Sequence, residues 1–119
     1  MKKVLIVDDS KTILKTAKLI LTDLYEVYLA NSGEMGLDIL SKKEIDLVLM
    51  DVDMPDMDGI ETVKRIRETD KKDIPVIFFT ALATKEVVAN CMNVGMKGYI
   101  LKPYKSEELI SKIQSVLNE

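Results

Sequence analysis

The sequence has no histidine, no tryptophan and a single cysteine, Cys91. Without histidine, the chain cannot form a His-ligated zinc site or a Ser-His-Asp triad, and it cannot carry a phosphohistidine of its own. One cysteine excludes an internal disulfide, and the apolar neighbours of Cys91 predict that its thiol is a buried filler.

The chain also lacks long apolar runs and a surplus of positive charge. No run approaches the ~20 apolar residues of a membrane span, and the first apolar run is cut off by two aspartates, unlike a signal peptide. The formal net charge is −3. Since there is no basic stripe, neither a nucleic-acid nor a membrane partner is expected. The 119 residues are enough for one domain, residues 1–119, which we expect to be cytoplasmic.

Short apolar segments alternate with segments of helical period. We expect strands at residues 4–7, 25–29, 47–50, 76–79 and 99–101, of which 25–29 has the alternating pattern of an edge strand. Almost wholly apolar strands separated by helices indicate a parallel sheet covered on both faces. Because crossovers are right-handed, the predicted fold is α/β: a doubly wound, flavodoxin-like (βα)₅ unit with strand order 2-1-3-4-5.

Polar residues mark the expected helix starts. The predicted caps after the first helix are Asn31, Asp58, Thr84 and Ser106, and Gly95 is expected to end the fourth helix. In the first helix we expect a buried stripe formed by Ile13, Ala17, Ile20 and Leu24.

Four of the five strands end in residues suited to phosphate chemistry. Asp8 and Asp9 follow the first strand, Asp51 follows the third, and Thr80 and Lys102 end the fourth and fifth. In such sheets, ligands bind outside the carboxyl ends of the strands, so these side chains should lie together.

Asp8, Asp9, Asp51 and Asp53 would then form a carboxylate cluster. Two like charges 4 Å apart repel by ~4 kcal/mol at an effective dielectric constant of ~20, and a hard cation relieves this repulsion. Oxygen ligands favour Mg²⁺, with Mn²⁺ as the alternative. One carboxylate could attack phosphorus and form an acyl phosphate, while the threonine hydroxyl and the lysine ammonium contact the remaining oxygens.

Each residue taken alone has a simpler explanation. Asp9 or Ser10 could cap the first helix, Asp51 could be a solvated strand end, Thr80 an ordinary strand residue and Lys102 a surface lysine. Their joint arrival at one sheet edge is what favours a functional site.

At this point the chain resembles a known family. The motifs are Val7-Asp8-Asp9-Ser10, Asp51 followed by Met54-Pro55 and Met57-Asp58-Gly59, Thr80-Ala81, and Tyr99 before Lys102-Pro103-Tyr104. Over its whole length the sequence resembles a bacterial response-regulator receiver domain, of the stand-alone type that is similar to chemotaxis regulators.

The resemblance implies a role for each site residue. Asp51 would be the phosphoacceptor. Asp9 would bind Mg²⁺ directly, Asp8 through water and Asp53 by its backbone carbonyl. Lys102 would pair with the phosphoryl group, and the Lys102-Pro103 bond would be cis. Two further residues form the implied switch: Thr80, which closes on the phosphoryl group, and Tyr99, whose rotamer follows it.

The resemblance also implies partners. A histidine kinase or phosphotransfer protein would donate the phosphoryl group, and the chain would catalyse only its own phosphorylation and dephosphorylation. We expect no output module after Glu119, and therefore expect signalling through association at the face of the fourth helix, fifth strand and fifth helix. The chain would be a monomer or a phosphorylation-dependent dimer.

Three residues depart from common family patterns. Leu24 stands where many receivers have glycine, so an unusual turn is expected after the first helix. Asp53 is acidic where a neutral side chain is also common, and Leu82 is large and apolar. Asp53 and Leu82 flank the path of a water attacking the phosphoryl group, so they bear on its lifetime.

Two other functions were considered. A haloacid-dehalogenase-type phosphohydrolase would use Asp51 and Asp53, but the aspartate pair of that family follows its lysine in the chain, and no cap segment is present. A nucleotide- or flavin-binding module would need a glycine-containing loop after the first strand, where the sequence has Asp8-Asp9-Ser10-Lys11.

Overall fold

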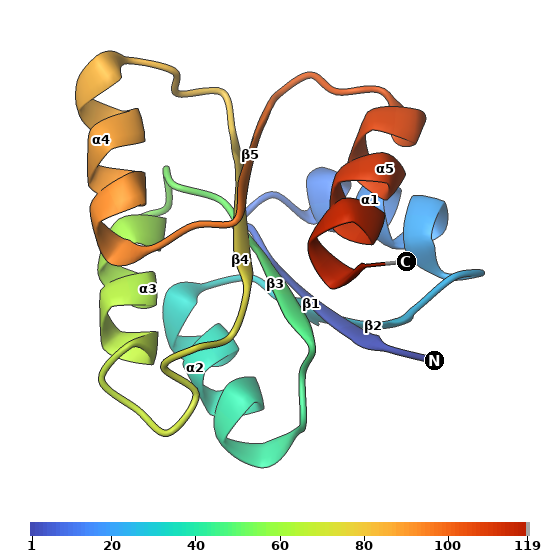
Figure 1. Ribbon diagram of the computed structural model, residues 1–119, viewed down its shortest axis with the longest axis horizontal. Coiled ribbons are helices and arrows are strands. Elements are labelled where there is room, and N and C mark those ends of the chain that lie inside the picture. Colours follow the sequence, from blue (N-terminus) through green and yellow to red (C-terminus); the bar gives the residue numbers. More distant parts are fainter. Residues whose placement is uncertain (119) are drawn as a thin grey trace.

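Five parallel strands form one sheet with helices on both faces, as Figure 1 shows for the computed structural model, which describes residues 1–118. The strands are β1 (Lys3–Val7), β2 (Glu26–Ala30), β3 (Leu47–Met50), β4 (Val76–Thr80) and β5 (Gly98–Leu101). The helices are α1 (Lys11–Leu21), α2 (Gly33–Lys42), α3 (Gly59–Ile66), α4 (Lys85–Val94) and α5 (Ser106–Leu117). The strand order is β2-β1-β3-β4-β5, which confirms the predicted fold.

Two hydrophobic cores lie on opposite faces of the sheet, because successive strand residues point to opposite sides. Leu5 and Val7 of β1 pack in the core beneath α2, α3 and α4. Val4 and Ile6 pack in the other core, beneath α1 and α5. The central strands are therefore buried on both faces, which explains their nearly continuous apolar sequences.

The helix caps are partly as expected. Ser10, Asp58 and Thr84 accept hydrogen bonds from the first turns of α1, α3 and α4, and Gly95 ends α4. The prediction for Asn31 was wrong, because Ser32 caps α2 by accepting from the Met35 N–H.

The predicted cap of α5 was also wrong. Ser106 is the first helical residue, and Lys105 precedes it in an extended conformation without a side-chain cap bond. In neither helix does the sequence distinguish between two adjacent polar residues, and the backbone conformation decides which one caps.

The stripe predicted for α1 needs a correction. The buried residues are Leu14, Ala17 and Leu21, whereas Leu24 is 43% exposed. The reason is that α1 ends at Leu21, so Leu24 belongs to the following turn. There the N–H groups of Leu24 and Tyr25 both donate to the Leu21 carbonyl. Cys91 is fully buried, as predicted. Within residues 1–118, the helices are all too short or too polar to cross a membrane.

Candidate functional site

The pairing of β1 with β3 brings two aspartates together at the carboxyl edge of the sheet. Val7 is in register with Met50, so Asp8 and Asp51 follow at adjacent strand ends. The Asp51 N–H donates to the Val7 carbonyl at 2.9 Å. Asp8 is 1% exposed and Asp51 5% exposed, so both carboxyl groups are almost completely removed from water.

Asp9 completes a group of three carboxylates. One oxygen from each of Asp8, Asp9 and Asp51 lies within 4.8 Å of the others. Three carboxylate oxygens at this separation are a donor set that fits a hard divalent cation such as Mg²⁺. The Asp53 side chain is exposed and is not part of this group, so the expectation that its carboxylate joins the cluster was wrong. The role of its backbone carbonyl as a ligand stays a prediction.

Lys102 reaches this group from the end of β5. Its Nζ lies 2.5 Å from Asp8 Oδ2 and 3.5 Å from Asp51 Oδ1. The ammonium group also lies 4.6 Å from the centroid of the Phe79 ring, within the range of a cation–π interaction. The Lys102-Pro103 peptide bond is cis, as the resemblance implied. Lys102 is therefore held among two carboxylates and an aromatic face, not exposed at the surface.

The environment of Asp51 disfavours its charge. Burial is the main reason that its pKa is raised above the ordinary value, and the negative charge of Asp8 acts in the same direction. The Lys102 charge and hydrogen bonds from Thr80 and Lys102 oppose this shift without cancelling it. The protein alone thus does not fully compensate the negative charge of Asp51.

Thr80 and Tyr99 are connected through Leu82. The fully buried Thr80 accepts a hydrogen bond from the Leu82 N–H at its Oγ1, over 3.3 Å. The Leu82 carbonyl in turn accepts a hydrogen bond from the Tyr99 hydroxyl. A displacement of the Thr80 side chain would therefore affect Tyr99, because the Leu82 backbone is hydrogen-bonded to both side chains.

Two residues near the site were given no role from the sequence. A Cβ atom on Gly59 would lie 1.9 Å from the Asp51 carbonyl oxygen, so only glycine allows α3 to start this close to Asp51. The presence of Gly59 in the Met57-Asp58-Gly59 motif was the available signal. Phe79, whose ring contacts Lys102, had no signal beyond its place in an apolar strand.

The sequence model of the response regulator receiver domain matches residues 4–114. The chain belongs to this family. Chemotaxis protein CheY-3 of Vibrio cholerae is 36% identical over 117 residues, which cover 96% of this chain and 90% of the relative. The transcriptional regulatory protein CrdR of Helicobacter pylori is 34% identical over 119 residues, and the match spans only 56% of that protein. The crystal structure of Vibrio cholerae CheY4 superposes with a TM-score of 0.93 at 36% identity, covering 98% of each chain.

This receiver is therefore a phosphorylation-activated signalling switch of the two-component type. Its family is not a family of catalytic enzymes, and the comparisons give no support to the phosphohydrolase alternative. Receiver domains generally use Mg²⁺ at an acidic pocket, and they interact with histidine kinases or phosphotransfer proteins and with output partners. In this chain, the three clustered carboxylates form an acidic group whose oxygens fit a divalent cation.

Proposed function

We propose that Asp51 is the phosphoacceptor of this receiver, with Lys102 and Thr80 as the groups that contact the phosphoryl oxygens. The observation that carries the proposal is the position of Asp51. Lys102 lies beside two carboxylates, and Asp51, at 3.5 Å, is the one that also shares a hydrogen bond with Thr80. Burial raises the pKa of Asp51, and a carboxylate with a raised pKa is a more basic nucleophile toward phosphorus.

In the proposed reaction, an Asp51 carboxylate oxygen attacks phosphorus and a new oxygen–phosphorus bond forms. The phosphorus–nitrogen bond of a donor phosphohistidine breaks, and the electron pair returns to the imidazole nitrogen, which can take up a proton. The donor is a histidine kinase or a phosphotransfer protein. Water later cleaves the acyl phosphate, so the chain would catalyse only its own phosphorylation and dephosphorylation.

Asp8, Asp9 and Asp51 would hold Mg²⁺, with the Asp53 backbone carbonyl as a further ligand. The ion supplies positive charge next to the transferred group. The protein itself supplies a positive charge at Lys102, which already lies 2.5 Å from Asp8 and needs only a short shift to favour a phosphoryl group on Asp51.

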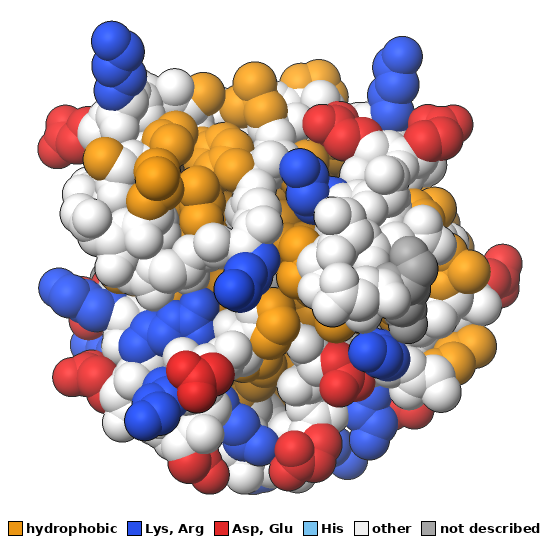
Figure 2. All heavy atoms as spheres, in the orientation of Figure 1, with side chains coloured by type: hydrophobic (Ala, Val, Ile, Leu, Met, Phe, Trp, Pro, Cys, Tyr) orange, Lys and Arg blue, Asp and Glu red, His pale blue; other side chains and the backbone are white. Residues whose placement is uncertain are grey.

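The output face is proposed at α4, β5 and α5. Figure 2 shows hydrophobic side chains gathered on the view that faces these elements, over and beside α4. Met92 of α4 is 63% exposed and Leu101 of β5 is 46% exposed. When Thr80 turns toward a phosphoryl group, its bond from the Leu82 N–H is strained, and Leu82 carries the bond to Tyr99 on β5. An output protein, or a second copy of the chain, would bind the changed face.

Acetyl phosphate with Mg²⁺ tests the assignment. Intact-mass measurement should show one added phosphoryl group, removed by alkali, and Asp51→Ala should abolish it. Asp9→Ala should sharply slow the labelling. Asp56→Asn is the control and should leave the labelling in place: Asp56 is in the same acidic loop but outside the carboxylate group, and asparagine tolerates its left-handed backbone. A phosphate found on Ser10 or Thr80 instead would overturn the assignment.

A further inference from the structure

Arg67 lies at the end of α3, at the sheet edge opposite to the site. Its guanidinium donates to four backbone carbonyls: Val94 at 3.0 Å, Gly95 at 2.8 Å, Lys72 at 2.8 Å and Ile74 at 2.7 Å. Two of these acceptors are at the carboxyl end of α4, and two are in the segment that leads into β4. One side chain thus ties the end of α4 to the start of the neighbouring strand.

The carboxyl end of a helix favours such a group. The last carbonyls of a helix have no partner within the helix, and they carry the negative end of its dipole. A guanidinium group satisfies several of them with fixed geometry and a positive charge. Burial lowers the pKa of Arg67 and the nearby Asp73 acts in the opposite direction, which fits a cation partly withdrawn from water.

The amino end of α4 is held by the Thr84 cap and by Val87, which is only partly buried against the core. Cys91 is the one buried residue that α4 contributes, and it lies in the second half of the helix. Lys85 and Glu86 in the first turn are exposed, as are Ala83 and Thr84 before it. The segment that precedes this end begins at Thr80, which is the residue proposed to move on phosphorylation.

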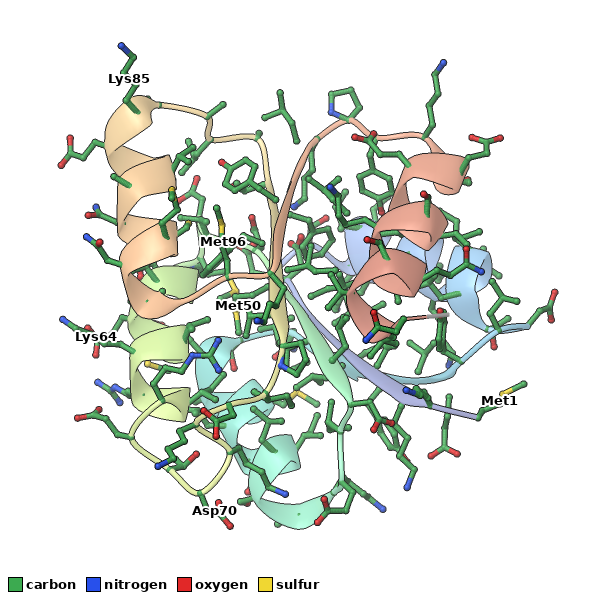
Figure 3. All side chains as sticks on the ribbon, viewed as in Figure 1. Met1, Met50, Lys64, Asp70, Lys85 and Met96 are labelled. Atoms are coloured by element: carbon green, nitrogen blue, oxygen red, sulfur yellow. The ribbon has the colours of Figure 1, made fainter. Side chains whose placement is uncertain are left out.

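The packing of the core beneath α4 can also adapt to a movement of the helix. This core contains Met50 and Met54, and Met96 packs against it; Figure 3 labels Met50 and Met96 in the layer between the sheet and the helices α3 and α4. The core beneath α1 and α5 contains no methionine among residues 1–118. Methionine is unbranched and flexible, so it adapts to a change in packing more easily than the branched side chains of the other core.

We propose that Arg67 is a positioning residue for the switch: it fixes the carboxyl end of α4, so that phosphorylation tilts α4 about this end. The proposal rests on the proposed function, because the movement starts at Thr80. It predicts unequal displacements at the two ends of α4. At 1.5 Å per residue, Lys85 lies ~15 Å from Gly95 and Asn93 lies ~3 Å from it, so a tilt displaces the amino end ~5-fold more.

Spin-label distances test this prediction. Cysteines are introduced singly at Lys85 or Asn93, each with a reference cysteine at the exposed Lys18 of α1 on the other face of the sheet. Burial raises the pKa of the Cys91 thiol to about 11, so we expect Cys91 to stay unlabelled, which intact mass checks. Distances are measured with and without beryllium trifluoride and Mg²⁺, which together mimic the phosphorylated state.

In the otherwise native chain, we expect the Lys85 distance to change several-fold more than the Asn93 distance. With Arg67→Gln the two changes should become similar, and with Arg67→Lys the ratio should be intermediate, since an ammonium group cannot reach all four carbonyls. Arg65→Gln is the matched control: Arg65 is an exposed arginine of the same helix that pairs with Glu61, and the native ratio should remain. If Arg67 served stability alone, a folded Arg67 variant would keep the native ratio of the Lys85 to the Asn93 distance change.

Equal changes at both ends of α4 in the native chain would overturn the pivot, and so would a native ratio in Arg67→Gln. If Arg67→Gln does not fold, the pivot is still tested by the ratio of the Lys85 to the Asn93 distance change in the native chain and in Arg67→Lys. No change at either end, in a chain that acetyl phosphate labels at Asp51, would refute the pivot while leaving the phosphoacceptor in place. Absence of labelling would instead count against the proposed function.

Discussion

Replacing Asp51 with asparagine should stabilise the folded chain in metal-free buffer, even though the substitution removes the proposed acceptor. The carboxylate oxygens of Asp8 and Asp51 lie within 4.8 Å, where two like charges repel by at least about 3.5 kcal/mol at an effective dielectric constant of 20. Lys102, 3.5 Å from Asp51, attracts it by about 5 kcal/mol on the same scale. These two terms almost cancel.

Burial then decides the sign. Asp51 is 5% exposed, and withdrawing a carboxylate from water costs several kcal/mol, a cost that a neutral amide largely avoids. Lys102 keeps its partner at 2.5 Å in Asp8, so the variant leaves no unpaired buried cation. We expect Asp51→Asn to raise the free energy of unfolding by about 1–3 kcal/mol at pH 7.5.

The pH dependence has a definite sign. Because the pKa of Asp51 is raised in the folded state, mainly by burial, the folded chain binds this proton more tightly than the unfolded chain does. The cost of its charge is therefore present above the folded pKa. It disappears as the pH falls through that pKa toward the ordinary aspartate value of about 3.9. The difference in free energy of unfolding between Asp51→Asn and the native chain should therefore decrease as the pH falls.

Urea unfolding followed by circular dichroism, with a chelator present, measures this difference. Millimolar Mg²⁺ should also reduce this difference, by stabilising the native chain more than the variant. A ligand at 100 times its dissociation constant stabilises the native fold by about 2.7 kcal/mol, and the variant lacks one carboxylate of the site. Asp53→Asn, exposed and outside the carboxylate group, is the control and should shift stability by less than about 0.5 kcal/mol. An Asp51→Asn chain less stable than the native one at pH 7.5 would refute the reasoning.

Three further predictions concern neighbouring residues. Lys102→Arg should slow labelling of Asp51 by acetyl phosphate, because a planar guanidinium cannot replace a compact ammonium held 2.5 Å from Asp8; unchanged labelling kinetics would contradict this. Gly59→Ala should lower the free energy of unfolding by at least about 1–3 kcal/mol, because its Cβ would lie 1.9 Å from the Asp51 carbonyl oxygen. Urea unfolding tests this, with Gly36→Ala, whose nearest contact is a Val7 methyl at 3.1 Å, as the milder comparison. Leu82→Ala should speed loss of the phosphoryl group by more than Asp53→Asn slows it; first-order decay rates without kinase decide, and the reverse ranking would mean that Asp53 positions the water.

The sheet and the place of the site were predictable from the sequence for a physical reason. Strands buried on both faces must be nearly all apolar, so each strand and the polar residue that ends it stand out along the chain. The right-handed crossover rule then leaves few strand orders, and the predicted order sets β1 beside β3. That is why the sequence alone predicts Asp8 and Asp51 at one edge of the sheet.

Other features depend on conformation that the sequence does not specify. Asn31 and Ser32 are both good cap residues, and only the extended backbone of Ser32 makes it the one that caps α2. The contact of Lys102 with Phe79 depends on a rotamer of a long side chain. Arg67 gave no signal either, because its partners are backbone carbonyls, which every residue has.

The proposed switch depends on the balance of charges at the ends of the strands. Three carboxylates and one ammonium group leave the unliganded site with two net negative charges, which one divalent cation balances. Phosphorylation at Asp51, the proposed acceptor, would remove its carboxylate charge but add a group carrying about −1.5 to −2, so the negative charge would move outward from Asp51. Lys102 would then be attracted more strongly to the phosphoryl group than to Asp8, and Thr80 would gain new hydrogen-bond acceptors. In this proposal, the switch follows from moving charge by a few ångströms between strand ends that the sheet holds fixed.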